Sequence, residues 1–301
     1  MSETPFIRRA AILGVNGFVG RLFARHLVES GRSVVGLDLH EAPFSGDLGI
    51  DYTRCDATSL GSQGMRALVE ADAALVCLPE EAALAALPGI LQAAGSGVLL
   101  VDTLSVKQRV ASLLACLRPK QEYLSINLMF SPKIGFQGQN VAVVNINEGP
   151  KAVEFLGMLA DWGATAVPVG AEQHDRLAAL IQVATHAALL SIGQVLCDWD
   201  YDIETAMGMA TPPHRIILAL LARICDAAPE VYWDIQQSNT FARDVRQSLT
   251  EKLAELSDVV EAGRVDKFRE MVAQIGETIQ PLKQELLDSA GLISAASSQP
   301  C

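Results

Sequence analysis

The chain has no excess of basic residues: 23 lysines and arginines stand against 35 aspartates and glutamates, for a net charge of −12. This balance argues against nucleic acid or an anionic membrane surface as a partner. The longest apolar runs, such as residues 216–222, are too short to span a bilayer. Residues 1–9 contain no apolar stretch of the kind that a signal peptide needs. We therefore expect a cytoplasmic protein with no membrane partner.

Cysteine is sparse, and its pattern excludes a common kind of metal site. The six cysteines lie at positions 55, 77, 116, 197, 225 and 301, without metal-ligand spacing. We expect free thiols in a reducing compartment and no bound metal.

What the sequence does contain is a regular alternation of short apolar runs and helical stretches in its first half. The apolar runs are residues 10–14, 33–37, 73–78, 98–101, 142–145 and 164–169. Residues 21–29, after the first run, have helical spacing. The alternation predicts an α/β fold, a Rossmann-type doubly wound parallel sheet with crossover helices.

The strand pattern stops at Gly170. Helical periodicity then continues through residues 172–194, 203–228 and 231–261, and the prolines at 212 and 213 mark a helix start or kink. The pattern predicts two domains, a nucleotide-binding domain at 1–169 and an all-α domain for dimerisation and substrate binding at 170–301. Because these helices are apolar on more than one side, we expect a homodimer formed through the helical half.

A glycine-rich turn follows the first predicted strand. Residues 14–20 read GVNGFVG, a variant of the dinucleotide fingerprint with Val15 where the first glycine usually stands. Gly17 would let a pyrophosphate approach the backbone, and the N–H groups of the following helix would bind it. Gly20 would let that helix pack closely on the strand. An ordinary strand–turn–helix is the alternative. The expected cofactor contacts, from this turn and from the ends of neighbouring strands, are Gly14, Asn16, Gly17, Phe18, Val19, Gly20, Leu78, Pro79 and Asp102.

Asp38 closes the second predicted strand. A carboxylate at this point can accept both ribose hydroxyls of NAD and would repel the 2′-phosphate of NADP. The residues that directly follow read LHE, without lysine or arginine. We therefore predict NAD as the cofactor; a strand-end cap is the alternative role of Asp38.

Two further segments carry a more specific pattern. Residues 101–107 read VDTLSVK and residues 125–132 read SINLMFSP. With the glycine turn, they resemble the catalytic edge of the prephenate dehydrogenase family, which has Asp-x-x-Ser-Val-Lys at the first site and His-Pro-Met-Phe-Gly at the second. The resemblance implies that Ser105 hydrogen-bonds the catalytic group and the substrate's ring substituent. A helix N-cap is an alternative role for Ser105, and both can hold together. Asn127 stands where the family has its catalytic histidine.

The resemblance continues through the helical half. It is carried by EQHD at 172–175, IQVATH at 181–186, TPPHR at 211–215, LARI at 221–224 and PEVYWDI at 229–235. It implies that His186 faces the substrate. Gln182 lies one turn before His186 on the same helix face and is a second candidate. A core histidine with one hydrogen bond is the alternative for His186.

The resemblance also implies a carboxylate-binding arginine at position 223. Arg223 lies in the otherwise apolar run 216–224. A buried guanidinium must be paired, either with an acidic side chain or with a substrate carboxylate. Arg215 is the second candidate, with an exposed or ion-paired residue as its alternative. Lys133, close to Asn127 in sequence, is the last residue expected at the substrate pocket.

Asn127 changes the chemistry that this edge can perform. Oxidation of prephenate takes hydride from ring C4 while the C4 hydroxyl gives up its proton, and a neutral histidine can accept that proton. An amide has no useful proton affinity. Loss of a general base costs about 10²–10⁴-fold in rate. The enzyme could therefore be slow or inactive, or His186, His174 or His214 could replace the base.

The third interpretation is a substrate that needs no base, and we favour it. In 4-amino-4-deoxyprephenate the nitrogen lone pair can expel the hydride without prior proton loss. We therefore predict NAD-dependent oxidative decarboxylation of this compound to 4-aminophenylpyruvate, with Ser105 and Asn127 at the reacting centre. Prephenate or arogenate oxidation is the alternative reaction.

Two other function classes stay open. A β-hydroxyacid dehydrogenase or imine reductase has a similar plan, but the former's lysine on the long helix has no counterpart between Lys151 and Lys252. A non-catalytic NAD-binding sensor would keep the glycine turn without needing Ser105, His186 and Arg223 together.

Overall fold

The computed structural model describes residues 5–41, 48–226 and 229–297, so Cys301 lies outside the described residues. The chain divides into two compact units, Met1–Asp175 and Arg176–Cys301. The division falls slightly later than the predicted boundary at residue 169. The reason is local, because Asp175 accepts hydrogen bonds from the backbone N–H groups of Lys107 and Gln108, each at 2.7 Å.

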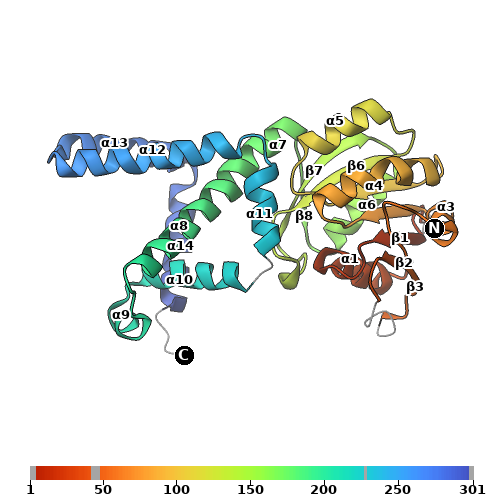
Figure 1. Cartoon of the computed structure of the whole chain (residues 1–301), viewed down its shortest axis with the longest axis horizontal. Helices are drawn as coiled ribbons and strands as arrows, with labels where there is room; N and C mark the ends of the chain where they lie inside the picture. The colour runs from red at the N-terminus through yellow and green to blue at the C-terminus, as the bar shows by residue number, and fades with distance from the viewer. Residues whose placement is uncertain (1–4, 42–47, 227–228, 298–301) are drawn as a thin grey trace. The chain divides into compact units, whose positions relative to one another are not determined.

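The first unit is built on an eight-stranded sheet in the order β3-β2-β1-β4-β5-β6-β7-β8 (Figure 1). The strands are β1 (Arg9–Leu13), β2 (Ser33–Asp38), β3 (Asp51–Arg54), β4 (Ala73–Val76), β5 (Leu99–Asp102), β6 (Tyr123–Leu128), β7 (Asn140–Asn147) and β8 (Thr165–Pro168). Neighbouring strands are parallel except β6 and β7. Only a short 3-10 turn, η1 (Pro132–Ile134), interrupts the connection between these two, which is too short for a parallel crossover. The predicted Rossmann-type fold is confirmed, with one antiparallel pair.

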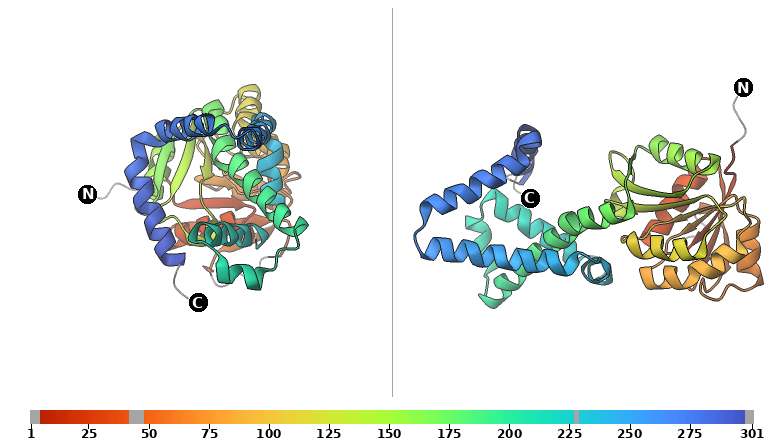
Figure 2. Two further views of the ribbon diagram at one scale, coloured as in Figure 1. Left: turned by 90° about the vertical axis from the view of Figure 1, so that its left-hand side faces the viewer. Right: turned by 90° about the horizontal axis from the view of Figure 1, so that it is seen from above.

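Helices cover both faces of this sheet, because successive strand residues point to opposite sides. On one face lie α1 (Phe18–Glu29) and α6 (Pro150–Asp161). On the other lie α3 (Ser62–Val69), α4 (Glu80–Ala93) and α5 (Gln108–Leu117), as the views of Figure 2 show. The strands are therefore held from both sides, and the carboxyl ends of β1 to β6 share one edge of the sheet.

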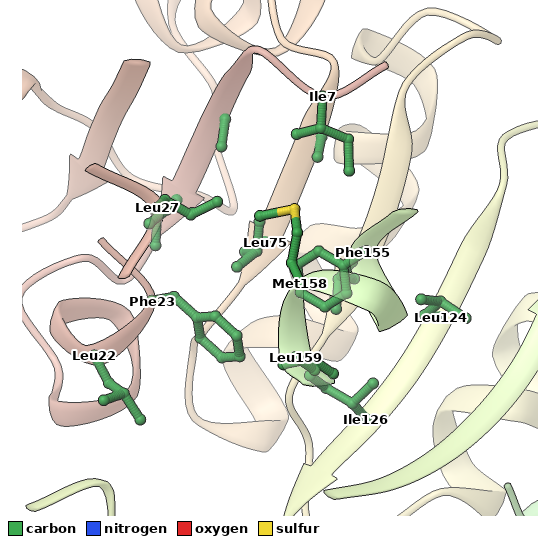
Figure 3. Close-up of a cluster of buried hydrophobic side chains, with 14 of the residues drawn as sticks. Ile7, Leu22, Phe23, Leu27, Leu75, Leu124, Ile126, Phe155, Met158 and Leu159 are labelled. Atoms are coloured by element: carbon green, nitrogen blue, oxygen red, sulfur yellow. The ribbon is translucent and has the colours of Figure 1, made fainter. Parts of the chain in front are cut away.

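The core beneath α1 and α6 is made of tightly buried side chains (Figure 3). Phe23 of α1 and Phe155 of α6 have ring centroids 6.0 Å apart, and both are fully buried. Leu75 and Ile126 contribute to this cluster from the strands. Each such side chain contributes about 1.5–3 kcal/mol by leaving water. This packing fixes the strand ends that carry the candidate site.

Two strands differ from the sequence expectation. The edge strand β3 was not among the predicted strands, because its sequence DYTR contains no apolar run. Its residues are exposed or half-buried and so need no apolar side chains. Asn127 lies inside β6, a strand that none of the predicted apolar runs covers and in which all six residues are buried. The polar residues at 125 and 127 interrupt the apolar pattern by which a buried strand is predicted. Both side chains form hydrogen bonds with buried partners.

The second unit is helical. It begins within α7 (Ala171–Ala178) and contains a π-helical stretch η2 (Ala179–Ala184), α8 (Thr185–Asp198), α9 (Ile203–Met209), α10 (Pro212–Cys225), α11 (Pro229–Ser238), α12 (Ala242–Glu261), α13 (Val265–Ile279), a 3-10 turn η3 (Gln280–Leu282) and α14 (Lys283–Ser297). The helices α12 and α13 lie side by side (Figures 1 and 2). Among the described residues of this unit, one small cluster of buried side chains consists of Ala179, Val183, Ile235 and Ala242.

Apolar surface is plentiful on this unit. Residues 171–198 form one helical stretch with a mean hydropathy of 1.6 in its most apolar window, of which 11% is buried. By length and composition alone it could cross a membrane. The same features suit a helix that packs against another protein chain.

Candidate active site

The glycine turn has the geometry of a nucleotide-binding turn. Gly14 has a φ of +80°, and a Cβ there would lie 2.2 Å from the carbonyl oxygen of Cys77. A Cβ at Gly20 would lie 2.3 Å from the carbonyl oxygen of Gly14. These two positions therefore require glycine, whereas a Cβ at Gly17 would approach only one atom, at 3.4 Å. The backbone at Gly17 is open to a ligand.

Val15 is accommodated by a second glycine on the neighbouring strand. It is fully buried, and a Cβ at Gly36 of β2 would lie 2.7 Å from its Cγ1. The missing side chain at 36 makes the room that Val15 occupies. The departure from the usual fingerprint therefore leaves the turn intact.

The residues at the head of α1 fit a dinucleotide. No side chain caps this helix, so the N–H groups of Phe18, Val19 and Gly20 stay available to an anion. Asn16 has a buried Oδ1 without a hydrogen-bond partner among the described residues. Its Nδ2 donates to the carbonyl oxygens of His40 and Glu41, at 2.8 and 3.2 Å.

Asp38 is held at the end of β2. Its carboxylate accepts the backbone N–H groups of Asn16, at 2.9 Å, and His40, at 3.2 Å. Arg54 of β3 is in register with it, and its Nε donates to the carbonyl oxygen of Leu39 at 3.0 Å. The proximity of this arginine to Asp38 could not be predicted from the sequence, because the two residues lie on different strands. The carboxylate of Asp38 retains lone pairs that could accept hydrogen bonds from ribose hydroxyls.

The remaining predicted cofactor contacts differ in exposure. Leu78 and Pro79 lie between β4 and α4, half-buried and exposed respectively. Asp102 is fully buried, and its Oδ1 accepts from Lys107 Nζ at 3.2 Å and from Ser125 Oγ at 2.9 Å. In this structure Asp102 supports the strand end and presents no surface to a nucleotide.

Lys107 connects Asp102 and Ser125 in a buried hydrogen-bond network. Its Nζ also donates to Ser125 Oγ at 2.9 Å and to the carbonyl oxygen of Ile126 at 2.7 Å. Burial lowers the pKa of Lys107, against the opposing effect of Asp102. The network joins β5 to β6 beneath the candidate site.

Ser105 lies in the turn between β5 and α5 and is half-buried. It does not cap the following helix, which begins at Gln108 and is capped by the carboxylate of Asp175. Among the described residues, its hydroxyl has no hydrogen-bond partner. Since Asp102 is in register with Ser125, the turn carrying Ser105 lies at the same sheet edge as Asn127.

Asn127 is hydrogen-bonded to His174 of α7. Its Nδ2 lies 3.1 Å from Nε2 of His174, and Nδ1 of His174 lies 2.7 Å from Oδ1 of Asp175. All three side chains are buried, with 3% or less of their surface exposed. Sequence reasoning considered His174 only as a substitute base, whereas the structure gives it a direct contact with Asn127.

Lys133 is exposed in η1, and its Nζ lies 5.7 Å from the ring centroid of Phe18. Phe18 belongs to the glycine turn and is 63% exposed. This contact places Lys133 beside the predicted cofactor turn, although the sequence had suggested the substrate pocket. Its substrate role stays a prediction.

In the second unit, His186 and Arg223 are close enough to interact electrostatically. Burial, together with the charge of Arg223, lowers the pKa of His186 and so favours the neutral imidazole. The His186 ring packs edge-on against Tyr232, with centroids 4.8 Å apart, and its buried Nδ1 has no partner among the described residues. Gln182 lies in the π-helical stretch, one turn earlier. Such stretches are frequent at functional sites.

Arg223 and Arg215 both lie on α10. Arg223 was predicted to be buried, but it is exposed and has no ion pair among the described residues, so its pairing with a substrate carboxylate stays a prediction. The apolar residues around it are mostly uncovered in the single chain, which explains the error. Arg215 donates to the carbonyl oxygen of Met207 at 2.7 Å and so joins α10 to α9. His214 shares a 2.8 Å hydrogen bond with the hydroxyl of Tyr201.

Comparison with known proteins identifies the family. Residues 170–274 match the family model "Prephenate dehydrogenase, dimerization domain". The chain is 38% identical over 267 residues to the 4-amino-4-deoxyprephenate dehydrogenase of Streptomyces pristinaespiralis, which covers 89% of this chain and 90% of that one. The chain belongs to the prephenate dehydrogenase family.

Solved structures of this family share the fold. The prephenate dehydrogenase from A. aeolicus, in complex with hydroxyphenyl propionate and NAD⁺, has a TM-score of 0.69 at 16% identity, covering 94% of this chain and 100% of that one. The arogenate dehydrogenase of Synechocystis has a TM-score of 0.66 at 15% identity, covering 91% and 99%. The predicted family and fold are therefore confirmed. The roles of individual site residues stay predictions.

Proposed function

We propose that this prephenate dehydrogenase family member oxidatively decarboxylates 4-amino-4-deoxyprephenate to 4-aminophenylpyruvate, with NAD as the cofactor. The observation that carries the proposal is Asn127, in the place of the family's catalytic histidine and bonded through its amide nitrogen to His174. The 38% identity to a 4-amino-4-deoxyprephenate dehydrogenase supports it. A cytoplasmic location and the absence of a nucleic-acid or membrane partner stay predictions.

The chemistry of this substrate requires no base. Ring C4 carries an amine and a hydrogen, and C1 carries a carboxylate. The nitrogen lone pair expels hydride from C4 and forms an iminium; the bond from C1 to its carboxylate then breaks, and its electron pair completes the aromatic ring. NAD, when bound, accepts the hydride. The products are 4-aminophenylpyruvate, carbon dioxide and the reduced cofactor, so atoms and electrons balance.

The residues of the first unit suit this reaction better than prephenate oxidation. The amide oxygen of Asn127 can accept an N–H of the neutral amine but cannot remove the proton of a C4 hydroxyl. The open hydroxyl of Ser105 can hydrogen-bond the same ring substituent. The head of α1, with Gly17 open and no side-chain cap, would hold the pyrophosphate of the cofactor.

A side-by-side assay of NAD reduction tests the proposal. Prephenate, arogenate and 4-amino-4-deoxyprephenate are compared by kcat/KM at one pH. We expect the amino compound to be oxidised at least about a hundredfold better than prephenate, the low end of a general-base contribution. Efficient oxidation of prephenate or arogenate would overturn the proposal.

Asp38 should select NAD. The Asp38→Ser variant should lose affinity for NADH and gain affinity for NADPH, because the carboxylate supplies both the ribose contact and the repulsion of the 2′-phosphate. Arg54, in register with Asp38, would then lie near that phosphate. Fluorescence titration with both reduced cofactors measures the change. Adding Arg54→Met should reverse the gain for NADPH. A wild type that prefers NADPH would contradict the assignment.

Arg223 should bind a substrate carboxylate. The Arg223→Ala variant should lower kcat/KM for the amino substrate about tenfold to a hundredfold, the value of a charge-assisted hydrogen bond. The pKa of His186 should rise toward its ordinary value, because the nearby positive charge is lost. Steady-state kinetics and an NMR titration of His186 check both effects, with NADH affinity as the control. An unchanged KM in the folded variant would return Arg223 to a structural role.

The helical unit should form a homodimer. Its long helix is only 11% buried over the most apolar window, and α13 alone exposes Val265, Phe268, Val272, Ile275 and Ile279. Such surface is unfavourable in water and is suited to a second copy. Sedimentation velocity at micromolar concentration should give a dimer, as the matched dimerization domain suggests. A monomer at that concentration would contradict this.

A further inference from the structure

We propose that His174 and Asp175 are positioning residues that fix the Asn127 amide in one orientation, with its carbonyl oxygen turned toward the ring substituent. The inference rests on the proposed function and deepens it, since it explains how an amide distinguishes an amine from a hydroxyl. Neither residue touches the substrate. They act only through Asn127.

The first step is the tautomer of His174. Oδ1 of Asp175 accepts the backbone N–H of Lys107, and Oδ2 accepts that of Gln108. A carboxylate offers only acceptors, so the imidazole Nδ1 at 2.7 Å must carry a hydrogen and donate it. In the neutral ring the other nitrogen, Nε2, is then an acceptor.

The second step is the amide. Nε2 of His174 lies 3.1 Å from Nδ2 of Asn127, which can only donate. His174 and Asn127 are each 3% exposed, so little water competes for this bond. The amide nitrogen therefore faces His174, and Oδ1 points to the opposite side. Among the described residues, Oδ1 of Asn127 has no partner.

The orientation matters for hydride loss from an amine. A carbonyl oxygen accepts an N–H and leaves the nitrogen lone pair free to expel the hydride. The reversed amide would direct an N–H donor at that lone pair and hold it back. The carbonyl oxygen can also accept the O–H of prephenate, but it cannot take the proton away. One orientation therefore favours the amine and gives no help to the hydroxyl compound.

The tautomer can be observed without substrate. The protein is labelled with ¹⁵N-histidine, and the ring nitrogens are examined by long-range ¹H–¹⁵N NMR, with the His174→Gln variant identifying the His174 signals. We expect His174 to carry its proton on Nδ1 at the pH of the assay. A proton on Nε2, alone or in a doubly protonated ring, would place a donor toward Asn127 and overturn the inference.

Kinetics of two variants test the consequence. In the His174→Gln variant, the side-chain oxygen of the new glutamine can replace Nε2 as the hydrogen-bond acceptor for Asn127. In the His174→Leu variant, the leucine side chain fills the space but offers no acceptor. We expect His174→Gln to retain most of the kcat for 4-amino-4-deoxyprephenate and His174→Leu to lose about tenfold, with NADH affinity unchanged in both. His26→Gln is the matched control. His26 lies on α1 and packs against Phe136 and Trp162, so its substitution should leave kcat unchanged.

The outcomes separate the two proposals. Equal kcat values for the two His174 variants and the wild type would overturn the positioning role. An equal loss in both would also overturn it, because that pattern indicates packing alone. If the wild type does not oxidise the amino compound, the proposed function fails, and the NMR tautomer alone decides the orientation of Asn127.

Discussion

The Asn127→His variant should oxidise prephenate up to about 10²–10⁴-fold faster than the wild type, the range of a general-base contribution. The structure indicates how the new imidazole would be held. His174 presents an acceptor nitrogen at 3.1 Å from the side chain of residue 127. It would accept the N–H of the new ring, whose second nitrogen would then be unprotonated and available to the C4 hydroxyl.

The same substitution should not help the amino substrate and should slow it. An imidazole can hydrogen-bond an amine, but its protonated form opposes the developing iminium charge. The two substrates should therefore respond in opposite directions. That crossing of specificities distinguishes a restored base from general damage to the site.

The measurement is kcat/KM for both substrates in the wild type, Asn127→His and Asn127→Leu. The leucine variant has no polar group and should be slow with both compounds. If Asn127→His gains no prephenate activity while it folds and binds NADH as the wild type does, the role assigned to position 127 is wrong. Efficient prephenate oxidation by the wild type would point to a different base.

Local patterns in the sequence were enough to predict the nucleotide-binding half. The glycines at 14 and 20 are required by close backbone contacts, and such requirements can be inferred from the motif itself. The strands that failed to stand out are those without an uninterrupted apolar run. In β6 the polar residues 125 and 127 are buried, because partners from other segments satisfy them.

The interactions that sequence order hides are long-range. The cap of α5 comes from Asp175, 68 residues after Lys107, and the partner of Asn127 comes from 47 residues further along. The burial of Arg223 was wrongly inferred from its apolar neighbours, which face outward in the single chain. Each of these depends on which segments meet in space, and composition and periodicity carry no such information.

The Lys107→Met variant should lower the free energy of unfolding by about 3–5 kcal/mol, the cost of breaking a buried ion pair. Both Lys107 and Asp102 have no exposed side-chain surface, and Nζ also satisfies Ser125 and the carbonyl oxygen of Ile126. Removing the ammonium leaves a buried carboxylate with Ser125 Oγ and the backbone N–H of Leu104 as its remaining donors. Urea unfolding at neutral pH measures the change, and Lys120→Met, an exposed lysine of the same unit, should change stability by less than about 0.5 kcal/mol.

The double variant Asp102→Leu/Lys107→Met decides whether the loss comes from the unpaired charge. An apolar replacement of both partners removes the buried carboxylate together with the ammonium, so it should be less destabilised than the sum of the two single variants by more than about 1 kcal/mol. Additive losses would mean that Lys107 and Asp102 act separately, through packing and through their contacts with Ser125 and Ile126.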